Sequence, residues 1–191
     1  MRRQLISALV VFVALTVVCG VLYPAVVTIA AQVGWSDEAD GSLVRDGDGT
    51  VVGSALLAQG FTEPQHFHPR PSAAGEGYDG TASGASNLGP SSAELLATVE
   101  ERAVAFREEN GLPVDATVPV DAVTASGSGL DPAISVANAR LQAPRVAAAR
   151  DLDLDVVLDL VAAHTTGRTA AVLGETTVDV LALDLALDDL R

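Results

Sequence analysis

Hydrophobic and polar positions divide this chain sharply near its start. Residues Leu5 to Val33 form an apolar run without a single charge, Arg2 and Arg3 precede it, and every acidic residue lies at or beyond Asp37. About 20 apolar residues suffice to cross a membrane as a helix, whereas the apolar region of a cleaved signal peptide spans only about 7 to 15 residues. The pattern therefore predicts a retained transmembrane helix, with a short cytoplasmic tip, over residues 1–34.

Positive charge predicts the orientation of this helix. Cytoplasmic flanks of membrane helices carry an excess of arginine and lysine, and the paired Arg2 and Arg3 are the only charges before Asp37. We expect a single-pass protein of the plasma membrane, with its N-terminus in the cytoplasm and residues 35–191 outside it. Cys19 is the only cysteine, so no internal disulfide can form.

Beyond residue 34 the pattern predicts the α+β class, with one compact extracytoplasmic α/β domain over residues 35–191. Short β-prone runs flank Asp46-Gly47-Asp48-Gly49 and predict a hairpin. Ser91 and Glu94 resemble a capping box for a helix over 92–110. The other expected elements are a strand over 119–124, a Ser/Gly loop over 125–131, a helix opening at Asp131-Pro132 and interrupted or restarted at Pro144, and a helix over 154–164. The stretch 178–187 fits a strand or a helix.

An irregular segment covers residues 61–90 and is rich in Gly, Pro, Ser, Ala and Asn. Long irregular segments in compact domains are usually functional or disordered. Because this one carries Phe61, Phe67, Tyr78 and Arg70, we interpret it as an ordered interaction loop.

Composition excludes several kinds of chemistry. Residues 37–191 carry nine arginines against 25 acidic residues, a formal charge of −16, so a nucleic-acid partner is not expected. This acidity either attracts cations to the membrane surface or keeps the domain soluble. The chain has no lysine, which excludes a phosphate-binding P-loop, a pyridoxal enzyme and the phosphorylated Asp-Lys-Thr-Gly motif of P-type pumps.

Two motifs suggest chemistry without completing a site. His66 and His68, with Glu63 nearby, have the spacing of a metal pair but lack a third ligand, so no metal site is predicted. The stretch Ser126 to Gly129 lacks the Gly-x-Ser-x-Gly spacing of a nucleophile, and no spacing ties His164 to it as a base. We interpret this stretch as a turn whose backbone amides can bind an anion, and we predict no catalytic residue.

A third motif places Gln142, Arg145 and Arg150 near a helix start. Arginine pairs with carboxylates or phosphates through its planar fork. These arginines therefore either bind carboxylates or phosphates of a partner, or form internal ion pairs with acids such as Asp151 or Asp155.

Several of these segments, in this order, resemble one family, the C subunit (KdpC) of the Kdp potassium-transporting P-type ATPase. The longest match is the run from Val123 to Pro132. The other matching runs, nearly end to end, are Leu22-Tyr23-Pro24, Gly41-Ser42-Leu43, Val52-Gly53-Ser54, Gln59, Phe61-Thr62, Phe67-His68, Arg70-Pro71-Ser72-Ala73, Ala82-Ser83-Gly84, Ser86-Asn87-Leu88-Gly89-Pro90, Pro119-Val120-Asp121, Gln142, Arg145-Val146-Ala147, Ala149-Arg150, His164-Thr165, Gly167-Arg168 and Leu173-Gly174-Glu175. Asp179 and Asp184 stand where the family usually has asparagine, and Thr176 where a proline is common.

The resemblance implies a non-catalytic accessory subunit of an ATP-driven potassium uptake complex. Its partners would be a channel-like potassium-binding subunit, an ATP-hydrolysing subunit and membrane lipid. The family is described as a catalytic chaperone that raises the ATP affinity of the pump subunit, and Gln142 matches a glutamine proposed to contact nucleotide. The predicted topology places Gln142 on the side of the membrane away from ATP, so ATP would act through the complex.

The resemblance also carries the candidate site residues. Those matched to the nucleotide or partner contact are Gln142, Arg145, Arg150, Ser126, Ser128 and Asp131. Those of the interaction loop are Phe67, His68, Arg70 and Asn87. The alternatives are a membrane-tethered binding domain of the envelope without a transporter partner and, third, an envelope hydrolase.

Overall fold

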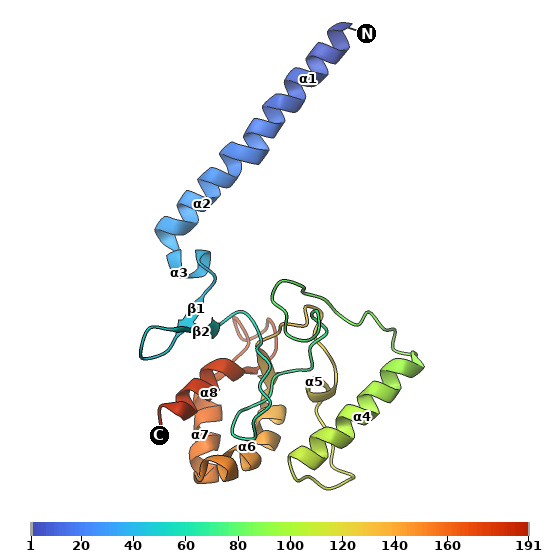
Figure 1. The fold of residues 1–191 in the computed structure, drawn as a ribbon, viewed down its shortest axis with the longest axis vertical. Coiled ribbons are helices and arrows are strands. Elements are labelled where there is room, and N and C mark those ends of the chain that lie inside the picture. Colours follow the sequence, from blue (N-terminus) through green and yellow to red (C-terminus); the bar gives the residue numbers. More distant parts are fainter. Residues whose placement is uncertain (1, 191) are drawn as a thin grey trace. The chain divides into compact units, whose positions relative to one another are not determined.

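The computed structural model describes residues 2–190, and the chain divides into two units, residues 1–52 and 53–191. It combines one N-terminal apolar helix with a compact mixture of helices and short strands, which confirms the predicted fold class (Figure 1). Each unit has its own internal packing.

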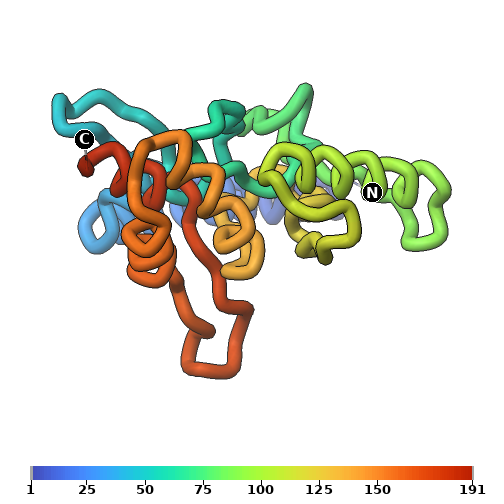
Figure 2. The backbone as a smooth tube through the Cα atoms, turned by 90° about the horizontal axis from the view of Figure 1, so that it is seen from below, coloured from blue at the N-terminus to red at the C-terminus, as the bar shows by residue number. Residues whose placement is uncertain are grey.

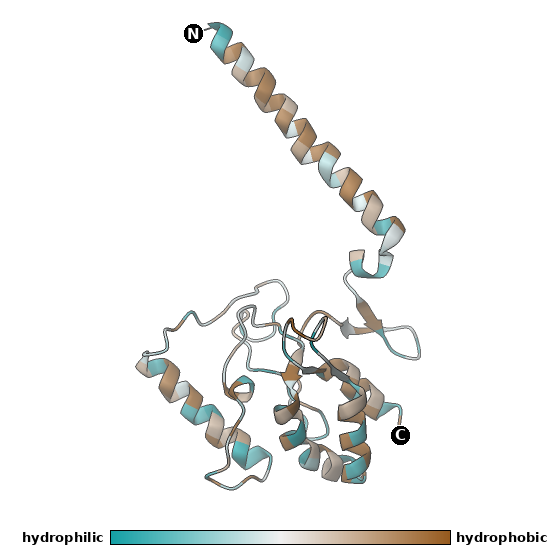
Figure 3. Ribbon diagram, turned by 180° about the vertical axis from the view of Figure 1, so that it is seen from behind, coloured by the Kyte–Doolittle hydropathy of each residue, from teal (hydrophilic) through white to brown (hydrophobic). Residues whose placement is uncertain are grey.

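The first unit is dominated by one long helix. Helix α1 (Arg2–Val17) continues through a π-helical turn (Val18–Leu22) into α2 (Tyr23–Gly34). The π-helical turn ends two residues before Pro24, which cannot donate a backbone hydrogen bond. The 33 residues from Arg2 to Gly34 span about 50 Å at 1.5 Å per residue, and none of them is buried by protein. Figure 3 shows that most residues along this helix are hydrophobic, and the helix is long and apolar enough to cross a membrane.

A short hairpin follows the apolar helix. After α3 (Ser36–Ala39), strand β1 (Leu43–Arg45) pairs with β2 (Val51–Ser54). The Oδ1 atom of Asp46 accepts hydrogen bonds from the backbone N–H groups two and four residues later, at 3.0 and 2.8 Å. This turn confirms the hairpin expected around the Asp-Gly sequence.

The core of the second unit lies between a small sheet and three helices. Strands β3 (Ala133–Ser135), β5 (Thr177–Asp179) and β4 (Thr165–Thr166) form an antiparallel sheet in the order β3-β5-β4. Helices α6 (Val136–Arg150), α7 (Leu154–Ala163) and α8 (Val180–Asp188) supply most of the remaining core. The core residues are Phe67, Ile134, Ala139, Ala143, Val146, Ala147, Val157, Val161, Val178, Val180, Leu183 and Leu187.

Helix α4 (Ala93–Glu109) lies apart from this core, beside α5 (Val120–Val123) (Figures 1 and 2). Its only buried residue is Phe106, whereas α6 buries six residues. The helix predicted over residues 92–110 is confirmed, but its cap is Ser92, whose hydroxyl accepts from the N–H of Leu95 at 3.4 Å. The expected cap at Ser91 is therefore one residue too early.

The strand predicted over residues 119–124 is wrong, because residues 120–123 form the single helical turn α5. The carboxylate of Asp121 explains this turn. It accepts hydrogen bonds from the backbone N–H of Ser135 at 2.7 Å, the hydroxyl of Ser135 at 2.9 Å and the amide of Asn138 at 3.1 Å. These tertiary bonds hold a sequence of high β-propensity in a helical turn.

The helix expected to open at Asp131-Pro132 is also wrong. The chain first forms β3, and α6 begins only after Ser135, whose hydroxyl accepts from the N–H of Asn138 at 3.1 Å. Helix α6 then continues through Pro144 without interruption. Arg140, whose carbonyl the proline cannot bond, is exposed, so water can satisfy that carbonyl.

The last two helices follow the sequence pattern more closely. Helix α7 confirms the prediction over residues 154–164. The ambiguous stretch 178–187 is both kinds of structure in succession, because β5 ends at Asp179 and α8 begins at Val180. The side chain of Asp179 accepts from the N–H of Ala182 at 2.8 Å, which fixes this change.

Candidate functional site

The irregular segment 61–90 is anchored in the core of the second unit. Phe67 is completely buried and packs among the apolar side chains of α6, α7 and α8. The backbone on both sides of it is bound by side chains from α6 and α8 rather than by a strand. We call these side chains the backbone-binding cluster: Gln142, Arg145, Arg150 and Asp184.

Helix α6 supplies the first two members of the cluster. Gln142 Oε1 accepts from the backbone N–H of His68 at 2.7 Å, and its Nε2 donates to the carbonyl of the same residue at 3.0 Å. Arg145 Nη1 donates to the carbonyls of Pro64 and His66, and its Nη2 donates to Gln142 Oε1 at 2.8 Å. Two side chains three residues apart thus occupy four backbone groups of the loop.

Arg150 and Asp184 complete the cluster. Arg150 Nε donates to the carbonyl of Gln65 at 2.7 Å, and its Nη1 forms an ion pair with Asp188 at 2.7 Å. Asp184 Oδ1 accepts from the backbone N–H of Phe67 at 2.8 Å. Together the four side chains bind backbone groups of five consecutive residues, which fixes the conformation of this part of the loop.

Burial gives Asp184 an unusual ionisation. Loss of water raises the pKa of Asp184 to about 7, although the N–H of Phe67 and the charges of Arg150 and Arg145 favour its ionised form. Its Oδ2 atom and the Nη2 atom of Arg150 are both buried without a hydrogen-bond partner. The cluster therefore contains a carboxyl group that changes charge near neutral pH.

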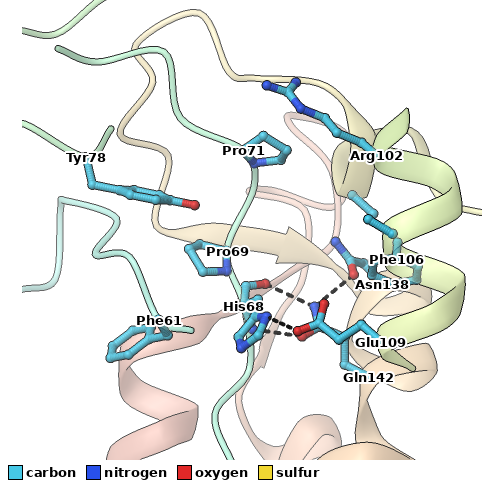
Figure 4. A pocket seen from close by; sticks show the side chains of 12 residues that line it. Phe61, His68, Pro69, Pro71, Tyr78, Arg102, Phe106, Glu109, Asn138 and Gln142 are labelled. Carbon is cyan, nitrogen blue, oxygen red and sulfur yellow. Dashed lines mark hydrogen bonds and ion pairs between the residues drawn. The ribbon is translucent and has the colours of Figure 1, made fainter. Parts of the chain in front are cut away.

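His68 connects the cluster to an open pocket of about 210 Å³. Its Nδ1 lies 2.9 Å from Glu109 Oε1 at the end of α4, and its Nε2 lies 3.1 Å from the carbonyl of Glu63. Burial lowers the pKa of His68, Arg145 lowers it further, and Glu109 opposes both. Figure 4 shows the pocket between the loop and α4. Its lining consists of Phe61, His68, Pro69, Pro71, Tyr78, Arg102, Ala105, Phe106, Glu109, Ala122, Asn138 and Gln142.

A second group of contacts holds the loop against residues 124–131. Arg70 Nη1 pairs with Asp131 at 3.1 Å, and its Nη2 donates to the carbonyls of Thr124 and Ala125 at 3.4 and 3.2 Å. The hydroxyl of Ser72 donates to the carbonyl of Gly129 at 2.6 Å. We call this group the Arg70 cluster; its members are Arg70, Ser72, Asp131 and the backbone of residues 124–129.

Gly129 is the tightest point of the Arg70 cluster. Its φ is +69°, a left-handed conformation that disfavours side chains. A Cβ atom at this position would lie 2.7 Å from both the nitrogen of Ala74 and the carbonyl oxygen of Gly84. Only glycine at position 129 therefore allows this backbone to approach Ala74 and Gly84 so closely.

Most of the residues singled out in the sequence are thus brought together, in two groups. Gln142, Arg145, Arg150, Phe67 and His68 meet at the backbone-binding cluster, while Arg70 and Asp131 belong to the Arg70 cluster. Ser126 and Ser128 lie beside it, with their hydroxyls 3.3 Å apart. Asn87 belongs to neither group; it is exposed and donates to the carbonyl of Ala85 at 3.2 Å.

His66 and His164 make contacts within the second unit. His66 packs its ring against Phe61, with centroids 5.3 Å apart, and burial lowers the pKa of His66. His164 Nδ1 contacts the carbonyl of Leu160 at 3.0 Å. Within residues 2–190, no histidine is bonded to a serine, and no three potential ligands from His, Cys, Asp and Glu gather where a metal could bind.

Sequence reasoning missed four polar residues of these networks. Asp121 and Asn138 join α5 to α6, and Asn110 accepts from Arg145 Nε at 3.0 Å. Asp184 was noted only as a departure from the family. The one signal available for it was a charged residue within the apolar run Leu181 to Leu187, and a charged side chain buried in this way requires a hydrogen-bond or ion-pair partner.

Comparison with known proteins shows extensive similarity. The family model described as "K+-transporting ATPase, c chain" matches residues 5–189. The chain is 55% identical over 190 residues to the potassium-transporting ATPase KdpC subunit of Mycobacterium tuberculosis strain H37Rv, with 100% of both chains covered. It is 54% identical to the subunit of the same name from Rhodospirillum rubrum, covering 99% of this chain and 97% of the relative. The equivalent from Gemmatimonas aurantiaca is 52% identical, covering 100% of this chain and 94% of the relative.

Proposed function

Because the chain belongs to the KdpC family, the c chain of the K+-transporting ATPase, we propose that it supports assembly of that complex from outside the cytoplasm. It is an accessory subunit of the Kdp complex and is not itself catalytic. Its second unit would contact the channel-like potassium-binding subunit, while its apolar helix would pack beside partner helices in the membrane.

The backbone-binding cluster is the observation that carries this proposal. Four polar side chains and the buried Phe67 are committed to holding an irregular segment in one conformation. Fixing a loop in advance lowers the entropy cost of binding, so such a segment is suited to present a surface to a partner. Loops held on a rigid scaffold commonly carry interaction sites.

Charge supports the location of the second unit. Arg2 and Arg3 precede the apolar helix, and the next charge after the helix is the acidic Asp37. This asymmetry favours a cytoplasmic N-terminus. Outside the membrane, the formal charge of −16 on residues 37–191 would raise the local concentration of potassium near the entrance of a channel-like partner.

We further propose that any effect on ATP affinity passes through the complex rather than through Gln142. The side chain of Gln142 is 1% exposed. Its oxygen accepts from His68 and Arg145, and its nitrogen donates to His68 and Asn138. A nucleotide would have to break these bonds to reach the amide, which supports a structural role for this side chain.

Assembly of the full complex tests the proposal. The full chain would be expressed with the channel-like and ATP-hydrolysing subunits and purified through a tag on this chain in mild detergent. We expect both partners to co-purify, and the Arg145→Gln variant, which weakens the hold on the loop, to recover less of them. Arg140→Gln, an exposed change on the same helix, serves as the matched control. Purification of the wild-type chain without either partner would contradict the proposal.

The membrane side is tested separately with reporters fused after Arg191. A reporter active only outside the cytoplasm should function, and one active only inside should not. The reverse result would overturn the proposed topology and restore access of this unit to ATP.

A further inference from the structure

The pocket between the loop and α4 is small and partly apolar. Its volume is about 210 Å³, below the range of about 300 to 1,000 Å³ that is typical of sites for drug-sized ligands. Figure 4 shows its apolar rings on both sides, with Phe106 on α4 and the others on the loop. These rings are Phe61, Pro69, Pro71, Tyr78 and Phe106. The pocket therefore suits a small ligand with an apolar middle.

Arg102 supplies a positive charge to this pocket. It lies on α4 and donates one hydrogen bond, from Nη1 to the carbonyl of Val123 at 3.2 Å. Its Nε and Nη2 atoms are not hydrogen-bonded to any other group of residues 2–190. A guanidinium with free donors binds a carboxylate through its planar fork, so Arg102 is suited to hold an anionic group of a ligand.

Glu109 supplies a negative charge. Its Oε1 atom contacts Nδ1 of His68, and its side chain is 40% exposed. Burial is the main cause that lowers the pKa of His68 below 6.5, so the ring is mostly uncharged at neutral pH and leaves Glu109 negative. Arg145, which also acts on His68, is bound to loop carbonyls and does not line the pocket. The Oε2 atom of Glu109 can therefore accept from an ammonium group of a ligand.

The two charges lie at opposite ends of the pocket (Figure 4). Glu109 follows Arg102 by seven residues on α4, and a helix rises 1.5 Å per residue, which separates the two positions by about 10 Å. Positions seven residues apart share one face of a helix. Side chains of a helix lean toward its N-terminus, so both charged groups are displaced in the same direction and the separation is largely kept.

Both charges together select a zwitterionic ligand. A purely anionic ligand, such as a nucleotide, would be repelled by Glu109 and by the formal charge of −16 on residues 37–191, and a purely cationic one by Arg102. A free amino acid carries its ammonium and carboxylate on one carbon, too close together to reach both ends. An extended chain spans about 3.3 to 3.6 Å per residue, so the termini of a tripeptide lie about 10 Å apart.

We propose that this pocket binds a free tripeptide, with its carboxylate on Arg102, its ammonium group on Glu109 and its central side chain against Phe106. The ligand would thereby join α4 to the ordered loop. This inference is independent of the proposed function, because it concerns the chain alone.

Calorimetric titration of the full chain in detergent at neutral pH tests the inference. The probe is glycyl-alanyl-glycine, and the controls are its N-acetylated form, its C-amidated form and ATP. We expect blocking either end to weaken binding at least about tenfold, because each block removes one charge-assisted hydrogen bond. Absence of binding by the unblocked tripeptide, equal binding of the blocked forms, or tighter binding of ATP overturns the inference.

Two variants locate the ends of the ligand. Arg102→Gln should lower the affinity for the unblocked tripeptide about tenfold and leave the affinity for the C-amidated form unchanged. Glu109→Gln should do the same, with the N-acetylated form as the insensitive one. Glu108→Gln on the same helix and Arg140→Gln on α6 are the matched controls and should bind like the wild type. An equal loss with blocked and unblocked peptides would show a distorted pocket rather than charge recognition, and it overturns the inference.

Hydrogen exchange gives a second measure. Phe106 is the only buried residue of α4, so a ligand that joins this helix to the loop should slow the exchange of its amide hydrogens. We expect slower exchange over residues 93–109 with the unblocked tripeptide and no change with the form blocked at both ends. Unchanged exchange in the presence of saturating tripeptide overturns the inference. Failure of the wild-type chain to co-purify with its partners would instead overturn the proposed function.

Discussion

The side-chain amide of Gln142 is paired with the backbone of His68 through two hydrogen bonds, one in each direction, at 2.7 and 3.0 Å. This is the pattern that a neighbouring strand would offer, supplied instead by one side chain of a helix. The buried N–H and carbonyl groups of the irregular loop are thereby hydrogen-bonded, although the loop is not part of the sheet.

Removing this pairing should destabilise the second unit. Gln142→Leu keeps the volume but leaves the N–H and carbonyl of His68 without partners, so we expect the free energy of unfolding to fall by about 3 kcal/mol. Denaturant unfolding of the full chain in detergent measures this change. Arg140→Leu, on the exposed face of the same helix, is the control. Unchanged stability together with weaker ATP binding to the complex would support a nucleotide role for Gln142.

Asp184 should make stability fall as the pH rises. Its pKa of about 7 in the folded state lies above the ordinary value of 3.8, so the folded state binds the proton more tightly than the unfolded chain. The stabilising effect of that proton is complete below about pH 4 and is lost as the pH rises to about 7.

Asp184→Asn removes this pH dependence, because the amide oxygen can still accept from the N–H of Phe67. Above pH 7 the variant should be more stable than the wild type by up to about 4 kcal/mol, and the difference should vanish near pH 4. Unfolding curves at several pH values test this. Asp188→Asn, which alters the more exposed partner of Arg150, is the comparison. Equal stability of wild type and Asp184→Asn at pH 8 would contradict the prediction.

The contact between His68 and Glu109 should be visible in the titration of His68. The pKa of His68 lies below the ordinary 6.5, so its contribution to stability is present above that pH and is lost as the pH falls through the folded value. Glu109→Gln removes the one nearby charge that raises this pKa and should lower it further. Nuclear magnetic resonance of the ring protons measures the shift, with Glu108→Gln on the same helix as control. An unchanged or raised pKa in Glu109→Gln would show that the pair does not form.

Gly129 should be the most sensitive glycine of the Arg70 cluster. Gly129→Ala places a Cβ atom 2.7 Å from two backbone atoms at a left-handed φ, so we expect a loss of about 3 kcal/mol. Gly127→Ala, two residues earlier, has no atom within 4 Å of the new Cβ and should cost less than about 1 kcal/mol. Equal melting temperatures for the two variants would show that Gly129 does not lie this close to Ala74 and Gly84.

Periodic, self-contained elements were predictable from the sequence, and elements set by distant contacts were not. The apolar run of residues 5–33 was predictable from its length and its lack of charge, and helices α4 and α7 because their apolar side chains repeat at helical spacing. Residues 119–124 have the local preferences of a strand, but the carboxylate of Asp121 binds Ser135 and Asn138 and imposes a helical turn.

The candidate site shows the same limit. The resemblance selected Gln142, Arg145 and Arg150, but only the structure shows that they bind loop backbone 74 to 85 residues away in sequence. No local pattern encodes a contact between a side chain and a distant carbonyl. The identity of the residues was therefore accessible, and their role was not.

The shallow packing of α4 has a consequence for motion. With Phe106 as its only buried residue, α4 has little apolar area to lose on detaching, whereas α6 is held by six buried residues. Amide hydrogens of α4 should therefore exchange with solvent long before those of α6, in openings that do not require global unfolding. Because α4 carries Glu109 and one wall of the pocket, each such opening would widen access to His68.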